Sequence, residues 1–151
     1  MKLNSVSKEK YGAGYSTAIL EQWKTYTETA NKITENRNSA NNFFIAINVA
    51  LAAAISFSQD YKNTILSVIG IIICIVWLCI IQNYKKLNTV KFQIINEIEN
   101  SLPLSPFNYE WKKLKTEYKY IGLTKIEKFI PIIFIVLYVI SIFHPIIEQS
   151  N

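Results

Sequence analysis

Uncharged residues gather in three windows of the sequence: residues 38–59, 63–84 and 129–147 contain no Asp, Glu, Lys or Arg. A helix of about 20 residues, at ~1.5 Å per residue, is as long as the hydrocarbon core of a bilayer is thick. A soluble protein would need far more amphipathic chain than this one has to cover three such helices. The pattern therefore predicts an all-α integral membrane protein with three transmembrane helices. The alternative is two spans with a re-entrant or interfacial first segment.

The first uncharged window continues a heptad pattern that begins well before it. Apolar residues recur at spacings of 4 and 3, which is typical of a helix that packs along another helix. Extending the pattern predicts one continuous helix from Ser16 to Phe57, whose first part is amphipathic. The seam consists of Ile19, Trp23, Tyr26, Ala30 and Ile33, and the same spacing continues through Arg37, Ala40, Phe44 and Ile47.

A row of acidic residues runs beside this seam, because Glu21, Glu28 and Glu35 are seven residues apart. Residues in a heptad row share one face of a helix, so the row can set the partner and the register of the helix. That partner is either another copy of the chain or the second amphipathic helix of the same subunit. The alternative is that the row forms a solvated face of a helix that packs only within its own subunit.

The second span also continues as an amphipathic helix, with a stripe that we expect the first helix's seam to cover. Pro103 ends this helix. The stripe is formed by Leu87, Val90, Ile94, Ile98 and Leu102, and Lys85, Lys86, Glu97, Glu99 and Asn100 lie away from it.

A short helix, Phe107 to Tyr118, is predicted after Ser105, which is a good cap, and Pro106, which suits the first helical position. Trp111 lies on its apolar face, and three basic residues, Lys112, Lys113 and Lys115, lie on the other. A basic helix tethered beside a membrane favours anionic lipid headgroups over nucleic acid as the partner. The third span follows a capping box formed by Thr124 and Glu127.

Basic residues predict the orientation of the chain, because Lys and Arg stay on the cytoplasmic side. Six precede the first span, one lies in the following loop, nine lie in residues 85–128, and none follows the third span. The amino terminus is therefore expected in the cytoplasm and the carboxyl terminus outside. The predicted segments are a flexible arm (1–15), a cytoplasmic amphipathic helix (16–42), a first span (43–58), an outside turn (59–63), a second span (64–82), a second cytoplasmic amphipathic helix (83–102), a cytoplasmic loop with a short helix (103–128), a third span (129–145) and an outside tail (146–151).

The first span contains small and polar residues where the other two are rich in Ile. Ala46, Ala50 and Ala54 lie one turn apart and allow another helix to approach closely, and Asn48 is polar in mid-span. Asn48 either joins helices together or lines a pore formed between subunits. We take these residues, with Glu21, Trp23, Glu28 and Glu35, as candidates for assembly or pore formation.

The sequence offers little catalytic chemistry. It contains no His/Cys/Asp cluster with metal-ligand spacing and no Gly-rich phosphate loop, and no Asp, Glu or Arg lies within the three uncharged windows. We therefore expect no enzymatic activity, no metal and no cofactor.

Five stretches of the sequence carry a resemblance to a known family. They are Leu20-Glu-Gln-Trp-Lys-Thr-Tyr26, Arg37-Asn-Ser-Ala-Asn-Asn-Phe-Phe44, Tyr84-Lys-Lys-Leu-Asn-Thr-Val-Lys-Phe92, Leu102-Pro-Leu-Ser-Pro-Phe-Asn-Tyr-Glu-Trp111 and Thr124-Lys-Ile-Glu-Lys-Phe-Ile-Pro131. These stretches resemble the RipA family of octameric membrane proteins, which are small bacterial inner-membrane proteins. The resemblance implies a homo-oligomer, an octamer, in the bacterial cytoplasmic membrane. The overall plan is also similar to the two-span effector domains of bacterial defence systems.

The function expected from these observations is that of a non-enzymatic, homo-oligomeric scaffold or assembly module in the membrane. Its partners are expected to be other copies of the chain, anionic lipids and a protein partner that the sequence does not identify, but not nucleic acid. The alternative is a pore-forming effector, for example in a defence or stress response.

Overall fold

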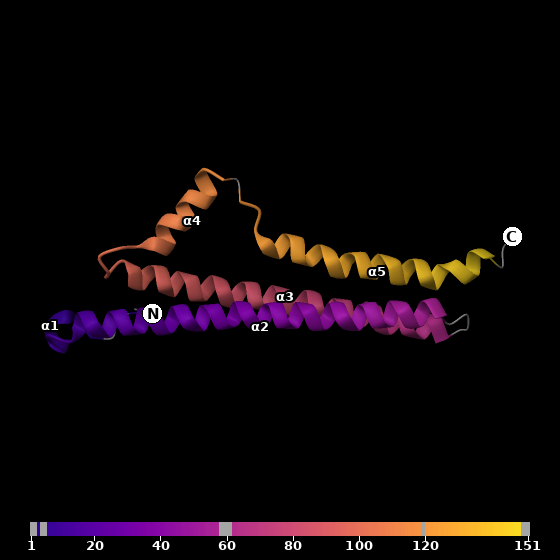
Figure 1. The fold of residues 1–151 in the computed structure, drawn as a ribbon, viewed down its shortest axis with the longest axis horizontal. Coiled ribbons are helices and arrows are strands. Elements are labelled where there is room, and N and C mark those ends of the chain that lie inside the picture. The colour runs from indigo at the N-terminus through magenta and orange to yellow at the C-terminus, as the bar shows by residue number, and fades with distance from the viewer. Residues whose placement is uncertain (1–2, 4–5, 58–61, 119, 149–151) are drawn as a thin grey trace. The chain divides into compact units, whose positions relative to one another are not determined.

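The computed structural model describes residues 3, 6–57, 62–118 and 120–148, and their side chains except those of residues 62 and 144–148. Over these residues the chain forms helices and no strand. The predicted all-α fold class is confirmed. In chain order the helices are α1, Lys8–Tyr11; α2, Tyr15–Phe57; α3, Lys62–Glu99; α4, Pro106–Thr116; and α5, Leu123–Glu148 (Figure 1).

Three stretches of helix are long and apolar enough to cross a membrane: Tyr15–Phe57, Asn63–Glu99 and Leu123–Phe143. They include residues 43–57, 64–82 and 129–143 of the three predicted spans. The first of them is one uninterrupted helix, α2, as the heptad pattern predicted. A re-entrant first segment would have to turn back within the membrane, and α2 has no such turn over its 43 residues.

The segment boundaries of the structure can be set beside those drawn from the sequence. The predicted flexible arm contains the short helix α1, and the predicted second amphipathic helix ends at Glu99 rather than at residue 102. Residues 59–61 of the predicted outside turn and residues 149–151 of the predicted tail lie outside the described residues.

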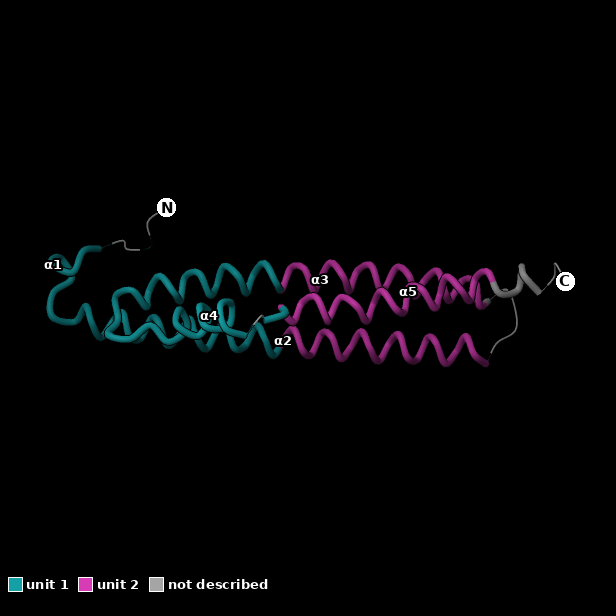
Figure 2. Tube along the Cα trace, turned by 90° about the horizontal axis from the view of Figure 1, so that it is seen from above, with its two compact units in different colours: residues 1–35, 85–121 teal, residues 36–84, 122–151 magenta. Residues whose placement is uncertain are grey.

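The chain divides into two compact units, coloured separately in Figure 2. Unit 1 comprises residues 1–35 and 85–121, and unit 2 comprises residues 36–84 and 122–151. Unit 1 therefore holds most of the charged, amphipathic parts of α2 and α3 together with α4. Unit 2 holds the uncharged windows.

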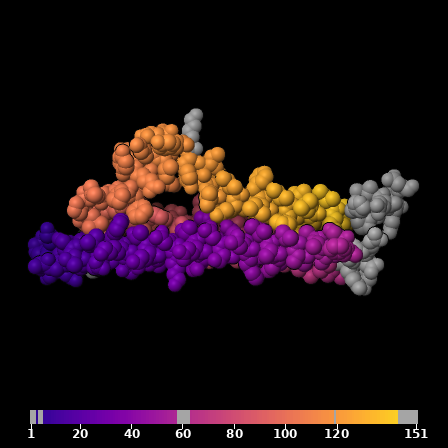
Figure 3. All heavy atoms as spheres, viewed as in Figure 1, coloured from indigo at the N-terminus to yellow at the C-terminus, as the bar shows by residue number. Residues whose placement is uncertain are grey.

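The core of unit 2 is formed where α2, α3 and α5 meet. Phe44, Trp77 and Ile81 are buried at its centre. The rings of Phe44 and Trp77 stack with centroids 5.7 Å apart. Within this unit the space-filling view shows α5 lying against α2 and α3 (Figure 3). Partly buried residues around the centre are Ile45, Ile73, Ile80, Ile130 and Phe134.

Unit 1 is held together by an antiparallel contact of α2 with α3 and by the start of α4. Ala30 and Ile33 of α2 are buried, as the seam predicted, and so is Ile95 of α3. The ring of Phe107 lies 6.0 Å from that of Trp23 and 5.6 Å from that of Phe92, centroid to centroid, so the first turn of α4 fills the end of the α2 and α3 contact.

The stripe predicted on the later part of α3 is wrong at Leu87 and Val90, whereas its other members, Ile94, Ile98 and Leu102, are half-buried. Leu87 and Val90 are 46% and 51% exposed, whereas Ile95 and Glu99 are fully buried. The reason is that α3 is one helix with one buried face, and Ile95 follows the buried Ile81 by two heptads. The interpretation of Glu99 as a residue on the polar face is therefore also wrong.

Candidate functional site

Asn48 of α2 is the centre of a buried polar cluster in unit 2. Its side-chain Nδ2 donates to the carbonyl oxygen of Phe44 at 2.8 Å. Its Oδ1 accepts from the hydroxyl of Tyr138 at 2.9 Å and from the thiol of Cys74 at 3.1 Å. Asn48, Cys74 and Tyr138 come from α2, α3 and α5, and each is at most 2% exposed. One amide thus joins three helices inside a single subunit.

The predicted assembly or pore candidates of the first span do not lie together. Ala46, Ala50 and Ala54 are exposed on α2, whereas Asn48 is buried between helices. Asn48 and the alanines therefore lie on different faces of the helix, and only the alanines are open to a neighbouring molecule.

A second polar cluster joins the start of α5 to α2. The guanidinium of Arg37 donates to the Glu127 carboxylate through Nε at 2.9 Å and also through Nη2, and Nη2 donates to the hydroxyl of Thr124 at 2.8 Å. Arg37 is 8% exposed, so its charge is compensated almost entirely by this pair. Nearby in the sequence, the ammonium of Lys128 donates to Gln82 Oε1 of α3 at 2.5 Å.

The capping box predicted from Thr124 and Glu127 is wrong. Helix α5 begins at Leu123, so Thr124 lies inside the first turn rather than before it. Both side chains bind Arg37 instead of free backbone amides. The reason is that a buried, charged guanidinium forms stronger hydrogen bonds than an amide at a solvated helix start.

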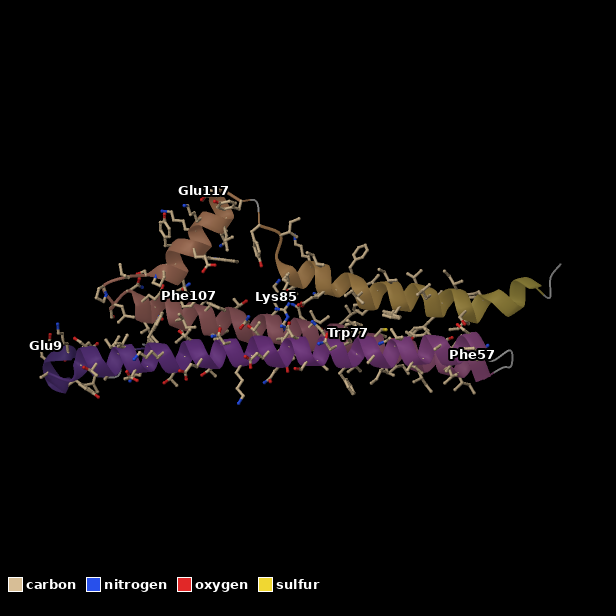
Figure 4. The ribbon with its side chains drawn as sticks, in the orientation of Figure 1. Glu9, Phe57, Trp77, Lys85, Phe107 and Glu117 are labelled. Carbon is tan, nitrogen blue, oxygen red and sulfur yellow. The ribbon has the colours of Figure 1, made fainter. Side chains whose placement is uncertain are left out.

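Trp77 connects α3 to α2 through its polar edge as well as its ring. Its indole Nε1 donates to Asn41 Oδ1 at 2.9 Å, while the ring stacks on Phe44. Figure 4 labels Trp77 on α3. A Trp in a predicted span is also compatible with a place at the membrane interface. The structure adds that Trp77 is 1% exposed and holds two helices together.

The predicted assembly candidates of unit 1 fall into two groups. Glu21, Glu28 and Glu35 are exposed on α2, and the Glu21 carboxylate lies 2.9 Å from the ammonium of Lys24. Trp23 is half-buried in the seam, where it packs on Phe107. The seam is thus used within the subunit, and the acidic row stays outside it.

Glu99 holds the start of α4. Its carboxylate is fully buried and accepts from the backbone amides of Phe107 and Asn108, each at 3.1 Å, one on each oxygen. The Ser105 hydroxyl makes no side-chain cap, contrary to the prediction, and donates to the carbonyl oxygen of Glu99 at 3.4 Å. Because a carboxylate satisfies free amides and opposes the helix dipole, Glu99 takes over the cap.

The membrane-surface candidates lie along α4, a helix with no buried residue. Trp111 is 46% exposed, and the ammonium of Lys115 lies 4.8 Å from the centroid of its ring. Lys112 is exposed, and Lys113 is half-buried, with its ammonium 3.8 Å from the Glu117 carboxylate. Basic and aromatic side chains therefore alternate on a helix that its own unit leaves largely uncovered.

Across the part of the chain that the structure describes, no group of three or more His, Cys, Asp or Glu side chains could hold a metal ion. The polar groups described above are engaged with one another and with backbone atoms.

Sequence reasoning missed most of the residues that carry the polar contacts between helices. Tyr138 gave no signal, because a Tyr in an apolar span is also compatible with an interfacial position. Arg37 did give one: a charged residue at a seam position needs a buried partner. Searching for an acidic residue at the end of another span would have found Glu127.

Comparison with known families agrees with this architecture over nearly the whole chain. Residues 20–147, which include most of α2 and all of α3 and α4, match the octameric membrane protein family (8xMP). The chain belongs to this family. Neither the comparison with curated proteins nor the comparison with solved structures gave a match.

Membership of the octameric membrane protein family fits the three apolar helices, and together they indicate a location in a membrane. The matched residues include both polar clusters of unit 2 and the Glu99 cap of unit 1. The octameric membrane protein family is described by its assembly, which makes the exposed faces of the helices the first place to look for function.

Proposed function

We propose that this chain is a non-enzymatic scaffold that assembles into a homo-octamer in the bacterial cytoplasmic membrane, and that it belongs to the RipA branch of its family. The proposal extends the assembly in the family's description to this chain. Its amino terminus and the segment from residue 83 to 128 lie in the cytoplasm, because these parts carry nearly all the basic residues.

The observation that carries the proposal is the division of α2 into a used face and an unused face. Buried contacts within the subunit engage Ala30, Arg37 and Asn48. The acidic row and the alanines remain exposed on the same helix. Small residues in a span favour contact with another helix over contact with lipid, so we assign this face to neighbouring copies.

Lipid is the second proposed partner, through α4. Lys112, Lys113 and Lys115 supply positive charge, and Trp111 supplies an aromatic ring of the kind that settles at headgroup depth. Since α4 ends only seven residues before α5 begins, it is tethered close to the membrane surface. Anionic headgroups match this chemistry.

A pore between subunits draws less support. Asn48 motivated the pore hypothesis, but its side-chain amide is hydrogen-bonded to Phe44, Cys74 and Tyr138 inside the subunit. The exposed face of the first span that would be left to line a pore carries Phe43 and Val49 besides the alanines, and these residues give water and ions few polar contacts. Liposomes that contain the protein should therefore not leak ions, and an ion leak that needs the assembled protein would favour the pore-forming effector instead.

The mass of the detergent-solubilised protein tests the scaffold directly. Native mass spectrometry should give a mass of eight chains with retained anionic lipid. Charge reversal of all three acidic residues, Glu21→Lys/Glu28→Lys/Glu35→Lys, should shift the mass downward. A monomer in the unaltered protein would overturn the proposal.

A second variant tests the lipid contact separately. Lys112→Gln/Lys113→Gln/Lys115→Gln should keep the mass of the protein shell but reduce the number of anionic lipids that survive in the gas phase. Lys8→Gln/Lys10→Gln/Lys32→Gln is a matched control, because it also removes three lysines from the same unit but none from α4. Equal lipid retention in both variants would assign the lipids to another surface.

A further inference from the structure

Unit 1 presents two rows of opposite charge on opposite sides of its α2 and α3 pair. Glu28 and Glu35 of α2 and Lys85 and Lys86 of α3 are all exposed. With 3.6 residues per turn, Glu28 lies about 160° around α2 from the buried Ala30. Lys86 lies about 180° around α3 from the buried Ile95. The acidic row and Lys86 thus point away from the contact between the two helices.

The two rows also lie at matching heights along the helices. The ammonium of Lys91 lies 4.5 Å from the ring centroid of Tyr26, which fixes these two residues opposite each other. Counting from this point at ~1.5 Å per residue, Glu28 and Glu35 lie at about 3 and 13 Å along α2. Because α3 runs antiparallel, Lys86 and Lys85 lie at about 7 and 9 Å in the same direction, between the two carboxylates.

An uncovered apolar patch lies beside the two lysines. Leu87 is 46% exposed and Val90 is 51% exposed. Both lie beyond the uncharged window that ends at residue 84. Val90 is one turn beyond Lys86 and therefore shares its face. The α3 face thus combines positive charge with exposed apolar surface.

We propose that this α3 face, formed by Lys86 and Val90 with Lys85 and Leu87 at its two edges, docks on the acidic α2 face of the next copy of the chain. The inference rests on the proposed function, because it needs a homo-oligomer, and it adds which two faces meet. Lys24 and Lys32 lie on the same side of α2, and Lys24 pairs with Glu21. Charge complementarity therefore commits Glu28 and Glu35, rather than the whole row, to a second copy. The aliphatic parts of the Glu28 and Glu35 side chains of the next copy then cover Leu87 and Val90.

The membrane explains why matching heights are informative. Copies inserted with the same orientation are related by rotation about an axis along the membrane normal, with no shift along it. A closed ring of this kind uses two different faces of each copy, and a residue meets its neighbour at its own height. Lys86 of one copy is then within a lysine's reach of Glu28 of the next, and Lys85 within reach of Glu35.

Reciprocal charge reversal tests the pairing in the full-length protein. Glu28→Lys/Glu35→Lys and Lys85→Glu/Lys86→Glu should each reduce the mass below that of the octamer, because each creates like charges at every interface. The combined four-residue variant restores opposite charges and should return the mass to the octamer. Lys24→Glu/Lys32→Glu makes the same charge change as Lys85→Glu/Lys86→Glu, but on the α2 face. This control variant should leave the octamer intact.

The outcomes separate this inference from the function on which it rests. If the two double variants lose the octamer and the combined variant does not regain it, or if both keep it, the assignment of faces is overturned while the octameric scaffold stands. If the unaltered protein is not an octamer, the proposed function itself fails.

Thiol cross-linking gives a test that does not depend on reversing charge. In a Cys79→Ser background, the variant Glu28→Cys/Lys86→Cys should give a ladder of covalent species longer than two chains with a short bis-maleimide, because each copy reaches both neighbours. Each single cysteine variant should stay monomeric on the gel. Dimers from a single variant would show that like faces meet and would contradict the proposal.

Discussion

The ring of Tyr138 occupies the space that a side chain at Gly70 would need. A Cβ added to Gly70 would lie 2.5 Å from both Cε2 and Cζ of that ring. The missing side chain lets α5 pack directly on α3, and this position brings the Tyr138 hydroxyl to Asn48. A glycine and a tyrosine on two different helices thus determine one contact.

Gly70→Ala should therefore destabilise the protein. Overpacking of this kind costs ~1–3 kcal/mol, because the ring has to move away from Asn48. Thermal unfolding in detergent, followed by circular dichroism, measures the loss. Gly122→Ala is the control, since a Cβ at Gly122 meets nothing within 4 Å. An unchanged melting temperature for Gly70→Ala would show that the helices repack freely.

Asn48→Leu should lower stability by ~1–2 kcal/mol, because it removes the side-chain acceptor of the Tyr138 hydroxyl and leaves that hydroxyl only the longer, 3.2 Å bond to the carbonyl oxygen of residue 48. Combined with Tyr138→Phe, it should cost less than the sum of the two single changes, since both remove the same hydrogen bond. Unfolding by increasing SDS in mixed micelles measures all four proteins. Asn42→Leu, which changes an exposed Asn of the same helix, should have little effect. Strictly additive losses would mean that the bond contributes nothing.

Arg37→Met should be among the most damaging single changes, at ~3–5 kcal/mol, because it leaves the Glu127 carboxylate without its charge partner. The double variant Arg37→Met/Glu127→Met should be milder than either single change, since no lone charge remains. Resistance to trypsin and the yield of folded protein in detergent report both effects. Lys125→Met, which removes an exposed charge in the first turn of α5, serves as the comparison. A double variant worse than Arg37→Met would contradict the argument.

Glu99→Ala should loosen the start of α4 without unfolding unit 2. Loss of a helix cap costs ~0.5–2 kcal/mol, and here two buried amides lose their acceptor at once. Hydrogen exchange at Phe107 and Asn108 should accelerate, and trypsin should cut faster at Lys112 and Lys113. Glu97→Gln changes an exposed Glu two residues away and should leave both rates unaltered. Unchanged exchange in Glu99→Ala would assign the cap to another group.

The sequence was sufficient to predict the fold class, because the signals were long. Three uncharged windows and one unbroken heptad pattern each extend over many residues, so an error at one position changes little. The seam of α2 was predicted correctly at Ala30 and Ile33 for this reason.

Phase and pairing could not be obtained in the same way. On α3, Leu87 and Val90 form an acceptable stripe by composition, and only the upstream packing of Ile81 selects the other phase. Glu99 and Glu127 looked like surface or capping residues, because their partners lie on other helices and are distant in sequence. Contacts of this kind depend on three-dimensional geometry that local periodicity does not contain.

The pairing of Arg37 with Glu127 has a consequence for the synthesis of the protein. The two residues are synthesised 90 positions apart, so α2 emerges with a cationic group whose counter-ion has not yet been translated. Until the last helix is made, the Arg37 guanidinium lacks the carboxylate that compensates its charge in the finished subunit. The charge of Arg37 is thus compensated only when the polypeptide is complete, and not when its first hairpin is inserted.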